Sequence, residues 1–305
     1  MKLDTHVHSV HSGDSTIYPF QGLLRECYNV PEAVYRLAKS RGMDLVTITD
    51  HDQIGGALVL AHLPDVIVGC EVTGVFPDDR VQVHLNVLGL DERQHREIQR
   101  LRHDIRELLP YLRQQNLFTS LNHVASGVNG PINAAHVAAL LPWVHALETN
   151  NGSRLPVQNR TAHCLAEAAG KIGIAGSDSH THRGIGHTWT EVPGARTRDE
   201  FIRGLFGGWV RVSGRMGSFG SMSSDVVRFA ANYYLEQIRR VVLQPLDWRG
   251  HVLLFGGVLG LPVIPLALAG AYLHFVYEQR FNQNLLFDLV ARPAPTTAQV
   301  PGLAA

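Results

Sequence analysis

The chain has 305 residues, which is more than one small core needs and fits either one large α/β barrel or two modest domains. Its 27 Lys and Arg residues balance 27 Asp and Glu residues, so no overall positive charge is available to hold long nucleic acid by its phosphates. Apolar residues make up 45% of the chain and charged residues only 18%, which indicates that one part is more apolar than a soluble domain.

The first part of the chain, up to about Val212, alternates short apolar runs with amphipathic stretches. We expect strands at 3–7, 45–49, 66–72, 81–88, 118–123, 144–148 and 172–175. We expect helices at 31–40, 92–115, 133–141, 157–170 and 198–206. This alternation is typical of parallel strands joined by crossover helices, and therefore of an α/β barrel or an open sheet.

The composition changes after Ser213. Residues 213–224 are rich in Gly and Ser and are expected to form a linker, followed by an amphipathic helix at 225–243. Residues 252–273 carry no Asp, Glu, Lys, Arg or His side chain and are long enough to cross a hydrocarbon core of about 30 Å. Pro262 and Pro265 would kink such a span or turn it into a re-entrant hairpin. We expect a membrane-associated segment; the alternatives are a buried helix and a hydrophobic contact between subunits.

Four parts are therefore expected along the chain. They are a metallohydrolase-like barrel at 1–213, a linker and amphipathic helix at 214–250, a hydrophobic membrane-associated segment at 251–291, and a disordered tail at 292–305. The arginines before the apolar segment slightly outnumber those after it, which favours a cytoplasmic N-terminal part.

Two further observations favour the cytoplasm. The N-terminus lacks the apolar run of a secretion signal. Cys27, Cys70 and Cys164 are odd in number and far apart, which argues against a disulfide framework. We expect a cytoplasmic protein that the C-terminal segment tethers to the inner face of the membrane.

Histidine is unusually frequent, with 17 residues, and many of them occur with carboxylates where a predicted strand ends. His6 and His8 are two positions apart, so in a strand both imidazoles point to the same face and can reach one metal ion. Further ligand types follow later strands, at His51, Glu71, His84, His123, Asp178 and His180. Because such side chains converge at the carboxyl end of a barrel, we expect a metal cluster there. Asp50 and Asp52 are expected to orient His51.

Six short motifs occur in a fixed order over roughly the first 190 residues. They are HVHSVHSGDS at 6–15, TDHD at 49–52, GCE at 69–71, HLNVLGLD at 84–91, NH at 122–123 and GSDSH at 176–180. In these motifs and their order the sequence resembles the PHP family, named for polymerase and histidinol phosphatase domains. Members of that family are phosphoesterases on a distorted (β/α)7 barrel with a trinuclear metal site.

The resemblance implies this fold, here with a C-terminal hydrophobic helical extension, and a set of metal ligands. It assigns the first ion to His6, His8, Glu71 and Asp178. Glu71 would bridge to a second ion at His84 and His123, and Asp14, His51 and His180 would hold a third. The family often has Ser-Asp-Gly where this chain has Ser12-Gly13-Asp14, so His11 is the substitute for Asp14.

Two or three divalent ions in one pocket neutralise the phosphoryl oxygens, lower the pKa of a bound water toward neutrality and stabilise the developing alkoxide. Phosphoester hydrolysis requires all three effects. We expect attack by a metal-activated hydroxide, with Glu71 and Asp178 as catalytic ligands, and Zn, Mn or Fe as the metal. Arg183 is a candidate for clamping a phosphate oxygen, and His182 for donating a proton to the leaving group.

Three interpretations of the function remain open at this stage. The leading one is a phosphomonoesterase or phosphodiesterase for a small phosphorylated substrate, such as a lipid-linked compound or a nucleotide. The second is an amide, carbamate or carboxylic ester hydrolase, because the same hydroxide attacks carbonyls. The third is a non-catalytic, membrane-tethered metal-binding module. No long nucleic acid is expected as a partner, and the sequence leaves the oligomeric state open.

Overall fold

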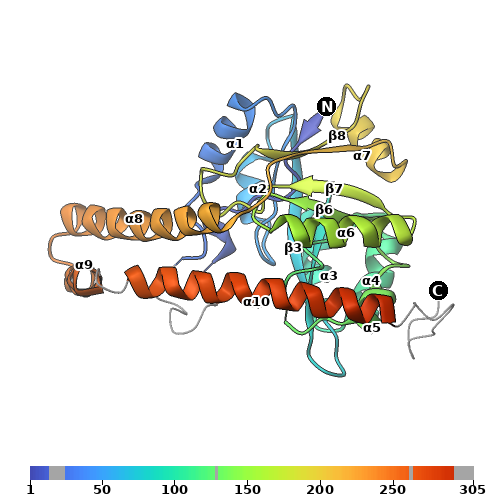
Figure 1. Ribbon diagram of the computed structural model, residues 1–305. Coiled ribbons are helices and arrows are strands. Elements are labelled where there is room, and N and C mark those ends of the chain that lie inside the picture. Colours follow the sequence, from blue (N-terminus) through green and yellow to red (C-terminus); the bar gives the residue numbers. More distant parts are fainter. Residues whose placement is uncertain (14–24, 128–129, 261–263, 292–305) are drawn as a thin grey trace.

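The computed structural model describes residues 1–13, 25–127, 130–260 and 264–291 (Figure 1). Its main sheet has six strands that follow one another in chain order. They are β2 (Val46–Ile48), β3 (Val66–Val75), β4 (Gln82–Leu88), β5 (Phe118–Leu121), β6 (Ala146–Asn151) and β7 (Ile172–Gly176). The β2–β3, β5–β6 and β6–β7 pairs are parallel, as the alternating pattern predicts.

Strand β4 is antiparallel to both of its neighbours, so the expectation of parallel strands is wrong at this point. The connection at 76–81 is too short for a helical crossover, and a direct connection of this kind closes an antiparallel hairpin instead.

The segment around Val7 joins the two edges of the six-stranded sheet. The Val7 carbonyl accepts a hydrogen bond of 2.8 Å from Thr49 N, just after β2, and Val7 also forms a parallel bridge with Ser179, just after β7. The sheet is thereby curled into a half-barrel, which is the part of the predicted barrel fold that the structure shows. The strand expected at 3–7 is only Lys2–Leu3 (β1), and it pairs with β8 (Thr188–Glu191). A further strand, β9 (Arg211–Gly214), completes this small antiparallel sheet.

Helices cover the sheet, and a large apolar core lies between them. They are α1 (Pro31–Ser40), α2 (Gly55–Leu60), α3 (Glu92–Leu101), α4 (Ile105–Gln114), α5 (Ala134–Leu140), α6 (Pro156–Ala168) and α7 (Arg198–Phe206). The single helix expected at 92–115 is divided in two, because the Asp104 carboxylate accepts the backbone N–H of Arg106 and starts a new helix.

The C-terminal part forms helices α8 (Phe219–Leu243), α9 (Trp248–Gly260) and α10 (Ile264–Ala291). Helices α8 and α10 contact each other and project from the half-barrel, with α9 at the far end (Figure 1). Residues 219–224, expected in a linker, are instead the first turns of α8, because the Ser218 side chain accepts from Ser221 N and caps the helix.

The apolar segment expected to cross a membrane, 252–273, is divided between α9 and α10. Pro265 lies in the first turn of α10, where proline is tolerated. Within the described ranges, the structure contains no helix with the length and apolar character that a bilayer crossing needs. Pro262 and the expected tail at 292–305 lie outside the described residues.

Two acids, of which Glu278 is buried and Asp288 partly exposed, hold α10 against the half-barrel. Glu278 is 2% exposed and accepts hydrogen bonds from Ser126 Oγ at 2.9 Å and from Gly127 N at 3.1 Å. Asp288 accepts from Ala134 N at the start of α5, at 3.1 Å. The helix therefore packs directly on the loop that follows His123.

Candidate metal centre

The His6–His8 segment lies at the carboxyl ends of β2 and β7, where its backbone is fixed on both sides. Asp178 N donates to the His6 carbonyl at 2.7 Å, and His8 N donates to the Ser179 carbonyl at 3.3 Å. The two imidazoles are fully buried, and their Nε2 atoms lie 3.0 Å apart. The structure therefore points the Nε2 atoms of both rings toward the same small volume.

Glu71 and Asp178 complete this first group of donors. From His6 Nε2, Glu71 Oε2 is 3.2 Å and Asp178 Oδ1 is 3.7 Å away. From His8 Nε2, the same two oxygens are 3.4 and 3.5 Å away. Ligand atoms at 2.0–2.1 Å from a tetrahedral ion are about 3.4 Å from one another. The distances between the two imidazoles, and from each imidazole to the two carboxylates, are thus close to those of a tetrahedral metal site.

The second oxygen of Glu71 faces a different pair of imidazoles. Glu71 Oε1 is 3.3 Å from His84 Nδ1 and 3.1 Å from His123 Nε2, and Asn122 donates to it at 2.8 Å. Glu71 Oε2 and His84 Nδ1 are both buried and have no hydrogen-bond partner within the described part of the chain. Two orphaned polar atoms at this position fit a bound cation.

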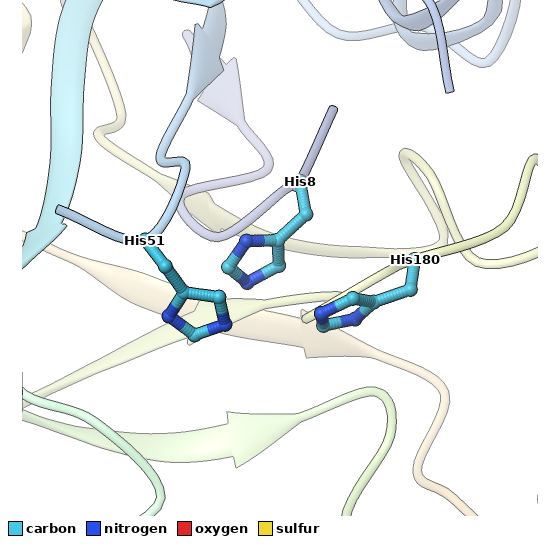
Figure 2. A group of neighbouring side chains, drawn as sticks. All are labelled: His8, His51 and His180. Atoms are coloured by element: carbon cyan, nitrogen blue, oxygen red, sulfur yellow. The ribbon is translucent and has the colours of Figure 1, made fainter. Parts of the chain in front are cut away.

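A third group of donors comes from three histidines, His8, His51 and His180, whose ring nitrogens can lie within 4.8 Å of one another (Figure 2). Glu26 Oε1 lies 3.4 Å from His51 Nε2 and 3.9 Å from His180 Nε2. Asp14 lies outside the described residues, and His11 is in none of the donor groups that the described residues form. Glu26 is therefore an additional candidate ligand, and no motif in the sequence pointed to it.

The electrostatics of the centre arise from carboxylates and imidazoles buried together. Burial raises the pKa of a carboxyl, but the imidazoles of His6, His84 and His51 hold the pKa of Glu71 well below its ordinary value. Burial lowers the pKa of His6, but Glu71 and Glu148 raise it well above the usual range. The pKa values of the buried carboxylates and imidazoles are thus set by one another.

Two candidate ligand positions have strained backbones. His123 has φ 27° and Asp178 has φ 49°, in the region that favours glycine. The His123 backbone is held by a hydrogen bond of 3.1 Å from its N–H to Glu148 Oε2. Backbone strain of this kind is concentrated at functional sites, where it fixes the direction of a side chain.

Glu148 and Arg154 are site residues that the sequence analysis did not single out. Glu148 Oε1 lies 2.9 Å from His6 Nδ1, and Arg154 Nη2 donates to Asp178 Oδ2 at 2.9 Å. Glu148 lies within β6, and Arg154 lies three residues beyond the carboxyl end of that strand. A charged residue at the end of a predicted buried strand was the available signal for Glu148. Arg154 follows a turn and had no such signal.

The expected roles of Asp50 and Asp52 are not what the structure shows. Asp50 accepts hydrogen bonds from Ser9 and from Ser12 Oγ, and Ser12 Oγ lies 3.1 Å from His8 Nδ1, so Asp50 supports His8 rather than His51. Asp52 forms an ion pair with Arg102 at 3.1 Å.

Arg183 and His182 lie beyond the donor groups. The Arg183 guanidinium makes two hydrogen bonds to Asp225 of α8, from Nη2 at 2.7 Å and from Nε at 3.1 Å. His182 is exposed, and its carbonyl accepts a hydrogen bond from Arg41 at 2.9 Å. In this structure Arg183 attaches α8 to the rim of the centre.

Comparisons with known proteins agree with this fold. A family model described as PHP-associated matches residues 156–208, from α6 to just beyond α7. An uncharacterized protein of Methanocaldococcus jannaschii is 29% identical over 77 residues, which are 24% of this chain and 44% of the relative. The chain thus aligns with less than half of that curated relative's length.

Two solved structures are similar to the chain. One is a two-domain protein from Bacteroides vulgatus that contains a predicted PHP-like metal-dependent phosphoesterase; it has a TM-score of 0.53 and 17% identity over 74% of this chain and 68% of its own. The other is an amidohydrolase from Chromobacterium violaceum, with a TM-score of 0.48 and 16% identity over 69% of this chain and 97% of its own. The resemblance to the PHP family that the motifs predict is confirmed.

Proposed function

We propose that this PHP-like chain is a metal-dependent phosphoesterase that hydrolyses a phosphomonoester or phosphodiester at a trinuclear centre. The observation that carries the proposal is the position of Glu71. One of its oxygens faces His6 and His8, and the other faces His84 and His123. A single buried carboxylate between two imidazole pairs fits a ligand shared by two cations.

The residues divide into three groups around the proposed ions. His6, His8, Glu71 and Asp178 would hold the first ion, and Glu71, His84 and His123 the second. His51, His180 and Glu26 would hold the third, together with Asp14 of the undescribed segment. The mixture of imidazole and carboxylate favours Zn, Mn or Fe.

When bound, such ions would neutralise the charge of the phosphoryl oxygens, lower the pKa of a water toward neutrality and stabilise the leaving oxygen. The chain's own side chains prepare the centre for this work. Glu148 orients His6 so that its Nε2 faces the centre, and Arg154 holds Asp178 by its outer oxygen. The proposed hydrolysis requires no nucleophile from the protein's own side chains.

Exposure indicates the side from which the substrate enters. The side chains of His6, His8 and Glu71 are fully buried, whereas those of His51 and His180 are 19% and 28% exposed. His51 and His180 of the third donor group therefore lie at the mouth. A phosphate that enters there meets the third group first and the buried Glu71 last.

The proposal is tested with protein loaded with Zn, Mn or Fe and three substrates: p-nitrophenyl phosphate, bis-p-nitrophenyl phosphate and an aryl carbamate. We expect turnover of at least one phosphoester, and loss of at least about 100-fold in kcat/KM for His8→Ala. The matched control is His163→Ala, because that ring is 59% exposed on α6 and should leave the rate unchanged.

Two outcomes would overturn the proposal. Turnover of the carbamate alone would assign the centre to carbonyl hydrolysis. No turnover of any of the three by a fully metallated sample would favour a non-catalytic metal-binding module.

A further inference from the structure

The turn between α8 and α9, with the adjoining part of each helix, carries a dense group of exposed apolar side chains. Six large ones are between 57% and 96% exposed: Val242, Leu243, Leu246, Trp248, Val252 and Phe255. They lie at the end of the helical extension that is farthest from the half-barrel (Figure 1). We call this group the apolar tip. Contiguous exposed apolar surface of this kind marks an interaction site.

The acidic side chains of the extension are engaged elsewhere. Asp225 pairs with Arg183 and Glu236 with Arg25, both on the half-barrel side of the molecule. Asp247, next to the apolar tip, pairs with Arg240 at 2.6 Å. Glu278 and Asp288 hold α10 against the loop after His123 and against α5. These acids are thus turned toward protein rather than left as free negative charge.

The cationic side chains show the opposite arrangement. Arg228, Arg239 and Arg280 are exposed on the extension and form no ion pair with any residue in the described ranges. From Trp248 to Tyr277 the sequence has no acidic residue at all. Arg239 lies on α8 three residues before Val242 of the apolar tip. Exposed apolar side chains beside an unpaired cation are complementary to an anionic lipid surface, in which the apolar groups enter the acyl region and the cation stays with the headgroups.

We propose that the apolar tip docks into the interface of an anionic bilayer, with Leu246, Trp248 and Phe255 as the inserted side chains. The extension then lies on the membrane and inserts only its end. Trp248 suits this position, because an indole has an apolar body and a polar N–H that stays at the headgroups.

Docking of the apolar tip would also hold the metal centre close to the membrane. Asp225 is joined to Arg183 and Thr181, just after His180, and lies on the same helix as Leu243. At 1.5 Å per residue, the helix from Asp225 to Leu243 is about 27 Å long. The mouth of the centre would thus stay within about that distance of the lipid headgroups.

The experiment measures sedimentation of the full chain with vesicles of phosphatidylcholine, with and without phosphatidylglycerol. We expect binding to the anionic vesicles and a blue shift of tryptophan fluorescence that Trp248→Phe removes. Leu246→Glu should weaken binding about tenfold or more, and Arg239→Gln about fivefold. Leu246 is 96% exposed, so its substitution should leave the fold and ester hydrolysis unchanged.

The matched control is Trp209→Glu against Trp248→Glu. The two indoles are 71% and 67% exposed, but only Trp248 belongs to the apolar tip. The proposal predicts that Trp209→Glu binds anionic vesicles like the unmodified chain. The proposal is overturned if the chain binds neither the neutral nor the anionic vesicles. It is also overturned if Trp209→Glu and Trp248→Glu change vesicle binding to the same extent. It is also overturned if light scattering shows a dimer that Leu246→Glu dissociates in the absence of any vesicle binding, because the tip would then be covered by a second copy.

Discussion

Glu148 Oε1 lies 2.9 Å from His6 Nδ1, on the side of the ring away from the nitrogen that faces Glu71 and His8. A carboxylate at this place keeps the proton on Nδ1 and leaves the lone pair of Nε2 for a cation. Ring orientation and tautomer are thus fixed by a residue that does not itself face the centre.

Glu148→Gln should therefore weaken metal binding without changing the donors. We expect a 10–100-fold loss of affinity, measured by competition with a chromophoric chelator. Glu167→Gln is the control, because that carboxylate is 69% exposed on α6 and should have no effect. An unchanged affinity in Glu148→Gln would show that His6 does not depend on Glu148.

Glu26→Gln should reduce the number of tightly bound ions. Glu26 Oε1 lies within 4 Å of both His51 and His180, whereas Glu71 lies near His51 and Asp178 near His180, so the loss of Glu26 should empty the third group first. Elemental analysis after dialysis should give one ion per chain fewer than in the unmodified protein. The control is Glu32→Gln, on the exposed face of α1. The same metal content in Glu26→Gln and in the unmodified chain would exclude Glu26 as a ligand.

Arg154→Met should destabilise the metal-free protein more than the loaded one. Arg154 donates to Asp178, whose side chain is 3% exposed, and its removal leaves a buried carboxylate without its guanidinium partner. The expected loss in the free energy of unfolding is about 3–5 kcal/mol without metal. A bound ion supplies positive charge to Asp178 and should reduce that loss. Urea denaturation with and without metal measures both values; an equal loss in the two states would contradict this account.

Arg183→Ala and Asp225→Asn should behave alike, because each removes the same partly exposed ion pair between the rim and α8. Each should lower the free energy of unfolding by up to about 1 kcal/mol, and the double variant should lose no more than either one. Michaelis constants for phosphoesters provide the second readout. A higher constant in Arg183→Ala but not in Asp225→Asn would support the phosphate clamp predicted from the sequence.

Stability in acid should depend on Asp65, which accepts hydrogen bonds from Lys39 Nζ at 2.8 Å and from Tyr35. Burial raises the pKa of Asp65, but Lys39 and Tyr35 lower it below its ordinary value of 3.8. The folded state therefore prefers the ionised form, so this contribution is present above pH 3.8 and is lost as the pH falls further. Asp65→Asn should lose up to about 1 kcal/mol at pH 5 and less at pH 3 in urea denaturation. An equal loss at both pH values would contradict the assignment.

The order of strands and the ligand types at their ends could be predicted from local pattern. His6, His8, Glu71 and Asp178 follow apolar runs, and the structure brings the two imidazoles within 3.0–3.7 Å of each other and of both carboxylates. The antiparallel direction of β4 could not be predicted from periodicity, because a strand has the same alternation in either direction.

Contacts between distant parts of the chain account for the rest of what the sequence did not reveal. Glu26 and Arg154 belong to no motif, and only the fold brings them to His51 and Asp178. Glu278 is 152 residues from Ser126, yet its burial depends on that contact. The apolar run at 252–273 predicts helical structure. Its composition alone does not show that the run is divided between two helices, α9 and α10.

Anomalous diffraction from crystals soaked in Zn or Mn tests the central claim most directly. The account predicts a strong peak about 2.0–2.2 Å from His6 Nε2, His8 Nε2, Glu71 Oε2 and Asp178 Oδ1, with a second peak between Glu71, His84 and His123. A map from well-folded, metal-soaked crystals with no peak between these side chains would contradict it.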